Sequence, residues 1–276
     1  MQTRADARPH PRPRVSARLG DRLYTASFRF YAELNDFLPT ARRQTDIEHR
    51  FRGRPAVKDA VESLGVPHTE VDLILINGSE AEFGTRLGDG DRVSVYPVFE
   101  ALDIGPVVRL RPRALREPRF LLDVHLGRLA RSLRLLGLDA DYANSYDDVE
   151  LTDRAFKLGR ILLTRDRGLL KRAAITRGYC VRQTDSRQQI LEILARFDLI
   201  GLIEPFSRCM ACNGVLQHVT KAEVADSLPA RVRELQDSFT RCDGCGRVYW
   251  QGTNYEQLRG FVEAIKADAS LAQARG

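Results

Sequence analysis

The chain has 276 residues, of which 43% are hydrophobic and 29% charged, and its formal net charge is +6. These proportions are typical of folded proteins and exclude the disordered and fibrous classes, while the length suits two or more domains. No apolar run approaches the roughly 18 residues that span a bilayer, and the arginine-bearing N-terminus lacks the apolar stretch of a signal peptide. The sequence therefore predicts a cytoplasmic protein that does not associate with membranes.

The positive charge is concentrated in two proline-bearing stretches. Residues 1–18 carry five arginines against one aspartate, and residues 107–119 carry five arginines against one glutamate. Because proline in such stretches favours extended backbone, we predict a basic disordered tail over 1–20 and a linker over 101–118. Two interpretations of this charge are open: a solubilising arm, or an arm that contacts nucleic acid.

The segment 21–100 has the pattern of a small mixed domain. Alternating residues predict strands over 23–30, 47–51, 71–76 and 92–98, with a helix over 56–64 between the second and the third. This order resembles that of ubiquitin-like β-grasp domains of the sulfur-carrier kind. Such carriers need a free Gly-Gly end, whereas this strand runs directly into the linker. We therefore expect the domain to dock a protein partner or to present substrate, and not to carry sulfur.

From residue 119 the pattern changes to strands that alternate with helices. Strands are predicted over 120–122, 160–164 and 179–182, and helices over 126–136, 149–158, 167–178 and 186–197. Strands separated by helices indicate an α/β domain with a parallel sheet, over residues 119–204. In such folds the functional site lies at the carboxyl ends of the strands.

Acidic residues occur at these predicted strand ends. Asp123 and Asp166 each follow a strand, Asp148 begins the second helix, and Asp185 follows the last strand. Carboxylates that converge above a sheet repel one another unless cations neutralise them, and hard oxygen ligands select Mg²⁺ or Mn²⁺. Such a site suits phosphodiester hydrolysis. Each acid taken alone could equally be a helix cap or a turn residue.

Four cysteines form the strongest local signal in the sequence. Cys209 and Cys212 make one C-x-x-C pair, Cys242 and Cys245 make a second, and 29 residues separate the two pairs. Two such pairs supply four thiolates for one tetrahedral zinc ion, which would be structural because no coordination position stays open. The alternative is free thiols or a redox pair. The long interval predicts an insertion, with a helix near 221–235.

Four stretches resemble one known family. They read FLLDVHLGRLARSLRLLGLDA, DDVELTDRAFKLGRILLTRDRGLL, RCMACNGVL and CDGCGRVYWQGTNYEQL, and they are similar to the Mut-seven C-terminal ribonuclease domain, a PIN-like nuclease fold with an appended zinc ribbon. The resemblance covers about 119–262, and the β-grasp segment before it looks like the ubiquitin-like domain often joined to that module. Asn254 stands where the family's ribbon usually has histidine, but all four cysteines are present.

The resemblance implies a nuclease with an acidic metal site. Asp123 matches the first-strand aspartate and Asp166 the aspartate of the T-R-D motif, while Asp148 is the choice for the middle acid and Asp185 for a fourth member. The implied cofactors are a structural zinc ion and a catalytic Mg²⁺ or Mn²⁺. The implied domains are a PIN-like nuclease domain over 119–204, a zinc ribbon over 205–262 and a C-terminal tail over 263–276.

Arginines near these acids are candidates for contacts with RNA. Arg128 and Arg131 lie with Arg134 on the side of the first helix opposite its apolar face, and Arg165 and Arg167 flank Asp166. They are either a solvated surface or a rim that contacts phosphates. Two functions from different classes are consistent with the sequence. One is a metal-dependent ribonuclease, and the other is a non-catalytic RNA-binding or adaptor protein that uses the ribbon and the β-grasp domain. The oligomeric state is open.

Overall fold

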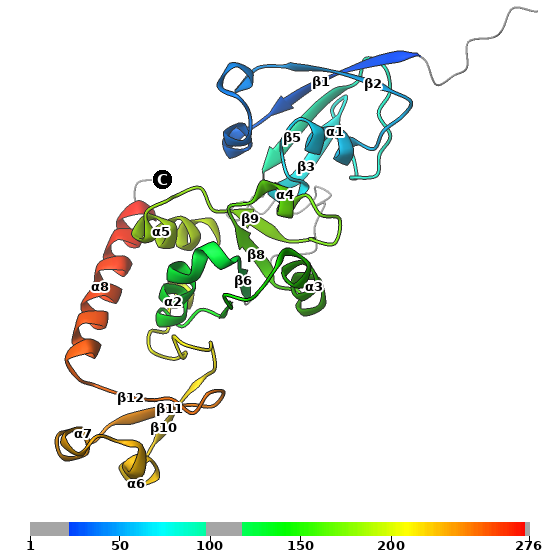
Figure 1. Ribbon diagram of the computed structural model, residues 1–276. Coiled ribbons are helices and arrows are strands. Elements are labelled where there is room, and N and C mark those ends of the chain that lie inside the picture. Colours follow the sequence, from blue (N-terminus) through cyan, green and yellow to red (C-terminus); the bar gives the residue numbers. More distant parts are fainter. Residues whose placement is uncertain (1–21, 98–117, 274–276) are drawn as a thin grey trace, which may run out of the picture.

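The computed structural model of the chain describes residues 22–97 and 118–273 (Figure 1). The predicted tail over 1–20 and most of the predicted linker over 101–118 lie outside these ranges. A β-grasp domain, an α/β domain and a ribbon follow one another along the described chain, and a long C-terminal helix returns from the ribbon to the α/β domain (Figure 1). Within both ranges, no helix combines the length and apolar character needed to cross a membrane.

The first domain is a five-stranded sheet with one helix packed against it. Its strand order is β2-β1-β5-β3-β4, and the two central strands β1 and β5 run parallel. Phe28 and Phe30 alternate with polar residues along β1, and they are buried with Val57 and Val61 of the helix. This confirms the predicted β-grasp fold. The elements are β1 (Leu23–Phe30), η1 (Ala32–Phe37), η2 (Thr40–Arg42), β2 (Ile47–Arg52), α1 (Val57–Ser63), η3 (His68–Glu70), β3 (Val71–Ile76), β4 (Ser79–Glu80) and β5 (Arg92–Pro97).

The second domain is a four-stranded parallel sheet of order β7-β6-β8-β9 with helices on both faces. This confirms the predicted α/β class. Gly137, with a φ of +87°, ends the first helix as the sequence predicts. The elements are β6 (Phe120–Leu122), η4 (Val124–Leu126), α2 (Gly127–Leu135), β7 (Ala140–Asp141), α3 (Asp148–Leu158), β8 (Ile161–Thr164), α4 (Arg167–Leu170), β9 (Gly178–Cys180), α5 (Ser186–Arg196) and η5 (Ile200–Leu202).

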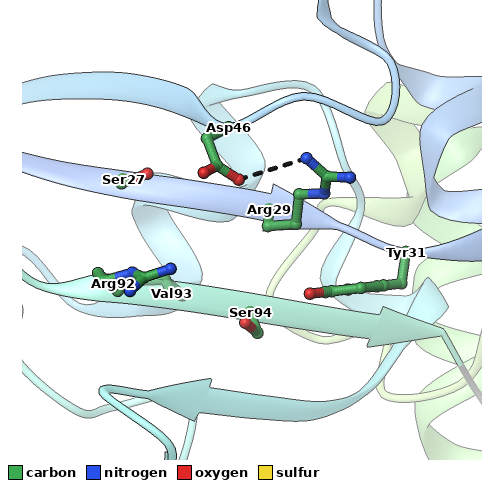
Figure 2. A pocket seen from close by; sticks show the side chains of 7 residues that line it. All are labelled: Ser27, Arg29, Tyr31, Asp46, Arg92, Val93 and Ser94. Atoms are coloured by element: carbon green, nitrogen blue, oxygen red, sulfur yellow. Dashed lines mark hydrogen bonds and ion pairs between the residues drawn. The ribbon is translucent and has the colours of Figure 1, made fainter.

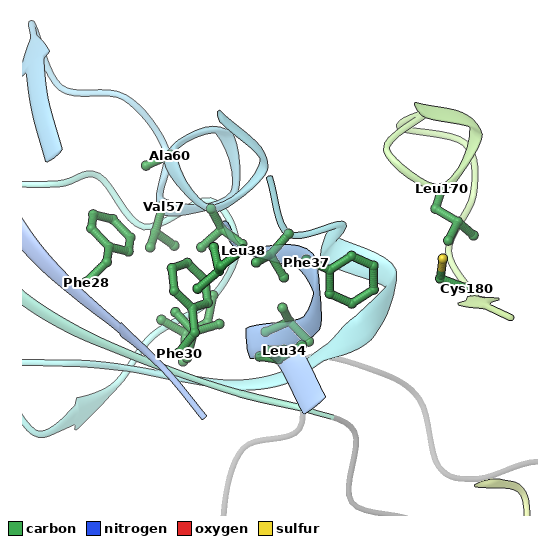
Figure 3. Packing of buried hydrophobic residues seen from close by; sticks show 14 of the residues in the cluster. Phe28, Phe30, Leu34, Phe37, Leu38, Val57, Ala60, Leu170 and Cys180 are labelled. Carbon is green, nitrogen blue, oxygen red and sulfur yellow. The ribbon is translucent and has the colours of Figure 1, made fainter. Parts of the chain in front are cut away.

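The two faces of this sheet belong to different apolar clusters. Phe120 and Leu122 of β6 pack with α2, α5 and the C-terminal helix. Leu121, which points to the opposite face, belongs to one cluster with α3, α4 and the core of the β-grasp domain. Figure 3 shows Phe37 of the β-grasp domain on the side that faces Leu170 and Cys180. The two domains therefore share a continuous hydrophobic core.

The helix predicted over 167–178 is wrong in its length, because α4 ends at Leu170. The chain then turns and buries Ile175 in the cluster shared with the β-grasp domain. His68 Nε2 lies 3.0 Å from the Ile175 carbonyl oxygen, and Lys171 Nζ donates a 2.6 Å hydrogen bond to the Glu62 carbonyl. Packing between the domains thus overrides the local helical pattern.

The ribbon and the final helix also differ from the sequence prediction in their boundaries. Pro229 divides the helix predicted near 221–235 into two short ones, since proline cannot donate the backbone hydrogen bond of a helix interior. The predicted tail over 263–276 is mostly the second half of the α8 helix, whose Val262, Ile265 and Ala269 are buried beside α5. The elements are β10 (Leu216–Val219), α6 (Lys221–Val224), η6 (Ala225–Ser227), α7 (Ala230–Leu235), β11 (Phe239–Cys242), β12 (Val248–Trp250) and α8 (Thr253–Gln273).

Candidate metal centre and acidic site

The sulfur atoms of the four predicted zinc ligands gather at one end of the ribbon. Cys209, Cys212, Cys242 and Cys245 place their Sγ atoms within 4.8 Å of one another. Across residues 22–97 and 118–273, this is the one group of three or more His, Cys, Asp or Glu ligand atoms that lie so close. Four sulfurs at this spacing could hold a metal ion such as zinc.

Two similar turns bring the cysteines together. The Asn213 N–H donates to the Cys209 carbonyl in the first turn, and the Gly246 N–H donates to the Cys242 carbonyl in the second. Asn213 and Gly246 both have positive φ angles, +73° and +71°, which asparagine and glycine tolerate best. A Cβ atom on Gly214 would lie 2.7 Å from the Cys242 Sγ. The lack of a side chain at Gly214 therefore allows the two turns to approach each other.

The electrostatics of the cluster favour a bound cation. Burial opposes ionisation of Cys209, but hydrogen bonds from the Tyr249 hydroxyl, 3.0 Å from its Sγ, and from backbone N–H groups lower the pKa of this thiol to about 6. Burial raises the pKa of Cys212 to about 12, and hydrogen bonds among the neighbouring sulfurs add to this. Thiolates so close together repel one another, so four of them require a positive charge in their midst.

Arg134 connects the first cysteine turn to the α/β domain through hydrogen bonds. The sequence places this arginine on the helix surface, and that expectation is wrong. Only 2% of Arg134 is exposed. Its guanidinium donates hydrogen bonds to the carbonyls of Met210 and Ala211, at 3.2 and 2.9 Å, and to that of Ala140 at 2.7 Å. Burial lowers the pKa of Arg134, and the negative charge of Asp141 opposes this shift. The planar guanidinium thus satisfies several carbonyls at once.

Replacing Arg134 by alanine is expected to destabilise the protein by about 3–5 kcal/mol, because buried carbonyls lose a charged donor. Urea unfolding would measure this loss, and hydrogen exchange at 209–213 would show whether the cysteine turn is released. Arg131→Ala is the matched control, since Arg131 lies exposed on the same helix. Equal effects of the two substitutions would contradict the anchoring role.

Two of the predicted acids lie at the ends of neighbouring strands and share one hydrogen-bonded residue. Asp123 is buried at the end of β6, and its Oδ2 accepts a 2.7 Å hydrogen bond from the Thr164 hydroxyl. The Asp166 N–H, at the end of β8, donates to the same hydroxyl oxygen at 2.9 Å. Thr164 therefore connects the two strand ends. Sequence analysis missed this role, although the T-R-D motif contains the residue.

The other two predicted acids have partners of their own. Asp148 is exposed at the start of α3, where its carboxylate forms a 2.7 Å ion pair with Arg172. The Asp185 carboxylate caps α5 by accepting from the N–H groups of Arg187 and Gln188. Asp166 likewise caps α4 through its Oδ1. Within the described ranges, the acids do not form a group of three with ligand atoms inside 4.8 Å.

The arginines predicted near the acids have two different environments. Arg128, Arg131 and Arg165 are exposed, as expected of residues that could meet a ligand. Arg167 instead donates hydrogen bonds to the backbone carbonyls of Phe37 and Asp36 in the β-grasp domain, at 3.1 and 3.2 Å. The residue after Asp166 is therefore part of the contact between the two domains.

A buried glutamate of the β-grasp domain completes this contact. Glu70 is 1% exposed, and its Oε1 accepts a 2.6 Å hydrogen bond from the Cys180 N–H at the end of β9. Its Oε2 lies 3.5 Å from the Arg182 guanidinium. No local pattern in the sequence marks this role of Glu70, because its partners are more than 100 residues away.

Taken together, the fold and the two sites define a β-grasp domain joined to an α/β domain that carries strand-end acids and a four-cysteine ribbon. Comparison with known families gives the same division. A model described as Mut7-C RNAse domain matches residues 118–262, and one described as Mut7-C ubiquitin matches residues 23–103. Since the first match covers more than half of the chain, the protein belongs to the Mut7-C RNase domain family.

One curated relative and three solved structures are similar to parts of the chain. The human protein called Exonuclease mut-7 homolog is 35% identical over 123 residues, which make up 42% of this chain and 14% of that protein. The crystal structure of the H. volcanii small archaeal modifier protein 1 is 19% identical, with a TM-score of 0.22, and the match covers 27% of this chain and 97% of that one. The Haloferax volcanii HVO 2177 protein is 26% identical, with a TM-score of 0.23, over 27% and 83% of the two chains.

Proposed function

We propose that the protein is a metal-dependent ribonuclease that hydrolyses RNA phosphodiester bonds at the strand ends of its α/β domain. The observation that carries this proposal is the pair Asp123 and Asp166, connected through Thr164 inside the segment that matches an RNase domain. In open parallel sheets, adjacent strand ends are where ligands bind. The name of the human relative supports a nuclease, and the RNase domain favours RNA as the substrate.

The two acids suit a hard divalent cation. Within the described part of the chain, Oδ1 of Asp123 and Oδ2 of Asp166 have no hydrogen bond or ion pair, so each residue keeps one carboxylate oxygen to offer. Carboxylate oxygens are the ligands that Mg²⁺ and Mn²⁺ prefer. When bound, such an ion supplies charge neutralisation at the phosphate and a more acidic water. Thr164 holds the Asp123 carboxylate in a fixed orientation.

The remaining predicted residues have supporting roles in this proposal. Asp148 is the proposed middle acid, and its exposed ion pair with Arg172 costs little to break. Asp185 is proposed as a fourth member. Arg128, Arg131 and Arg165 are exposed and would contact RNA phosphates. The four cysteines would hold a structural zinc ion, and the ribbon would assist RNA binding.

Replacing Asp166 by asparagine is expected to lower the rate of Mg²⁺- or Mn²⁺-dependent cleavage of single-stranded RNA by about 10²–10³-fold, because one charged ligand is lost. Asparagine is as good an N-cap as aspartate, so α4 and the fold should persist. The measurement is cleavage of end-labelled RNA and DNA panels with each ion and with EDTA. Asp153→Asn, on the exposed side of α3, is the matched control.

The same assay tests the other acids and the alternative function. Asp123→Asn should be as damaging as Asp166→Asn, while Asp148→Asn and Asp185→Asn would show whether these acids belong to the site. Undiminished cleavage by purified Asp166→Asn would refute the assignment of this residue. RNA binding that survives EDTA, with no cleavage by any divalent ion, would favour a non-catalytic RNA-binding or adaptor protein.

A further inference from the structure

A polar pocket of about 170 Å³ lies on the outer face of the β-grasp sheet, opposite the face that α1 covers (Figure 2). Two arginines line it, Arg29 of β1 and Arg92 of β5; the Arg29 guanidinium turns toward Asp46, and the Arg92 side chain lies along β5 (Figure 2). Hydroxyl groups of Ser27, Ser94 and Tyr31 also line it. This combination of guanidinium and hydroxyl donors suits an anion, and none of these residues belongs to the acidic site or the cysteine cluster.

The pairing of the two parallel strands explains how these donors converge. Ser27 of β1 is opposite Arg92 of β5, and Arg29 is opposite Ser94. Since alternate residues point to the same face, the four side chains form a rectangle with an arginine at each of two opposite corners. The strand positions of Arg29 and Arg92 are roughly 8 Å apart along the diagonal of this rectangle. Arginine side chains are long enough for both guanidinium groups to contact one phosphate across this distance.

The positive charge of this pocket is only partly compensated. Arg29 forms a single 3.5 Å ion pair with Asp46, and both side chains are well exposed to solvent, at 39% and 61%. Within the described ranges, the Arg92 guanidinium has no hydrogen bond or ion pair. The pocket is therefore complementary to a negatively charged ligand.

An aromatic pair extends the pocket along the same face. Tyr31 follows Arg29 by two positions, and its ring stacks on that of Tyr96 with 4.4 Å between centroids and 8° between planes. Tyr31 is 37% exposed, so its ring offers surface to a ligand. Proteins that bind single-stranded RNA combine positive side chains, which contact the phosphates, with aromatic rings on which the bases stack.

Tyr31 is also close in sequence to the contact between the β-grasp domain and the loop of the proposed nuclease site. Tyr31 precedes η1, and the Asp36 and Phe37 carbonyls of η1 accept the hydrogen bonds of Arg167, the residue next to Asp166. One short segment of the β-grasp domain thus connects Tyr31 with the loop that carries the proposed acid.

We propose that the outer face of the β-grasp sheet binds single-stranded RNA, with one phosphate between Arg29 and Arg92 and a base stacked on Tyr31. This inference rests on the proposed function and deepens it, because it gives the ubiquitin-like domain a part in holding the substrate. The phosphate contacts are independent of base identity, and the stacking contact tolerates any base.

Binding of a fluorescent single-stranded RNA to the full chain in EDTA tests the proposal without cleavage. Arg29→Gln and Arg92→Gln should each weaken affinity several-fold and reduce the slope of log affinity against log salt by about 0.7, as expected for one phosphate contact on a single strand. Tyr31→Ala should weaken affinity on the order of tenfold, whereas Tyr31→Phe keeps the ring and should bind like the unmodified chain. Arg54→Gln, an exposed arginine of the same domain outside the pocket, is the control.

The outcomes separate this inference from the proposed function. If Arg29→Gln and Arg92→Gln match Arg54→Gln in affinity and salt slope, the RNA site is overturned, even when the protein cleaves RNA. If they lose RNA affinity while no divalent ion supports cleavage, the RNA site stands and the proposed nuclease activity fails. The RNA site would also be overturned if Arg29→Gln and Arg92→Gln kept their RNA affinity but bound a protein partner more weakly.

Discussion

Replacing Cys242 by serine is expected to abolish the zinc binding proposed for the four cysteines and to unfold the ribbon, while the β-grasp and α/β domains stay folded. The ribbon has little core of its own: its apolar cluster contains three buried residues, Val224, Leu228 and Phe239. A structural zinc site contributes about 10–16 kcal/mol of apparent binding free energy, which in so small a unit is folding free energy. Loss of one thiolate should therefore remove most of the ribbon's stability.

Metal analysis and hydrogen exchange would measure this effect. The unmodified chain should hold one zinc ion, Cys242→Ser should hold none, and residues 209–250 should lose protection when the metal is chelated. Cys180→Ser is the matched control, because Cys180 is also buried but lies in the core shared by the first two domains. Protection that persists in Cys242→Ser, or in the chelated protein, would show that the ribbon folds without metal.

Replacing Glu70 by alanine is expected to lower the free energy of unfolding by about 3–5 kcal/mol, because the buried Cys180 N–H loses its acceptor and Arg182 loses a buried partner. Glu70→Gln keeps an acceptor for the N–H and should cost less. Urea unfolding gives the free energy, and hydrogen exchange at 178–182 locates the change. The control is Glu48→Ala, whose exposed ion pair with Arg50 should contribute less than about 1 kcal/mol.

The Glu70 result bears directly on the role of the ubiquitin-like domain. If Glu70→Ala were as mild as Glu48→Ala, the buried Glu70 carboxylate would not contribute to holding the two domains together. With the expected loss, the β-grasp domain is a fixed neighbour of the loop that carries Asp166. The expected docking of a protein partner by the β-grasp domain stays a prediction, because these contacts lie within one chain.

The acidic site shows where sequence reasoning stops. Strand ends are predictable because short apolar runs followed by aspartate repeat along the chain, so Asp123 and Asp166 could be placed at one edge of a sheet. Their connection through Thr164 depends on a hydrogen bond between residues 41 positions apart. Asp148 is expected at the start of a helix and Asp185 after the last strand, and their carboxylates pair with Arg172 and cap α5.

By itself the sequence determined the order of the domains, most strand and helix types, and the four cysteines that cluster in the ribbon. Each of these depends on residue spacing within a few turns or strands, and the spacing of a C-x-x-C pair already defines its chemistry. Only the tertiary structure decided that Arg134 is buried under the cysteine turn and that α4 stops at Leu170. It also decided that Glu70 reaches the end of β9. Such contacts arise when whole domains pack together. Packing brings residues into contact that are far apart in the sequence, so no local sequence pattern predicts them.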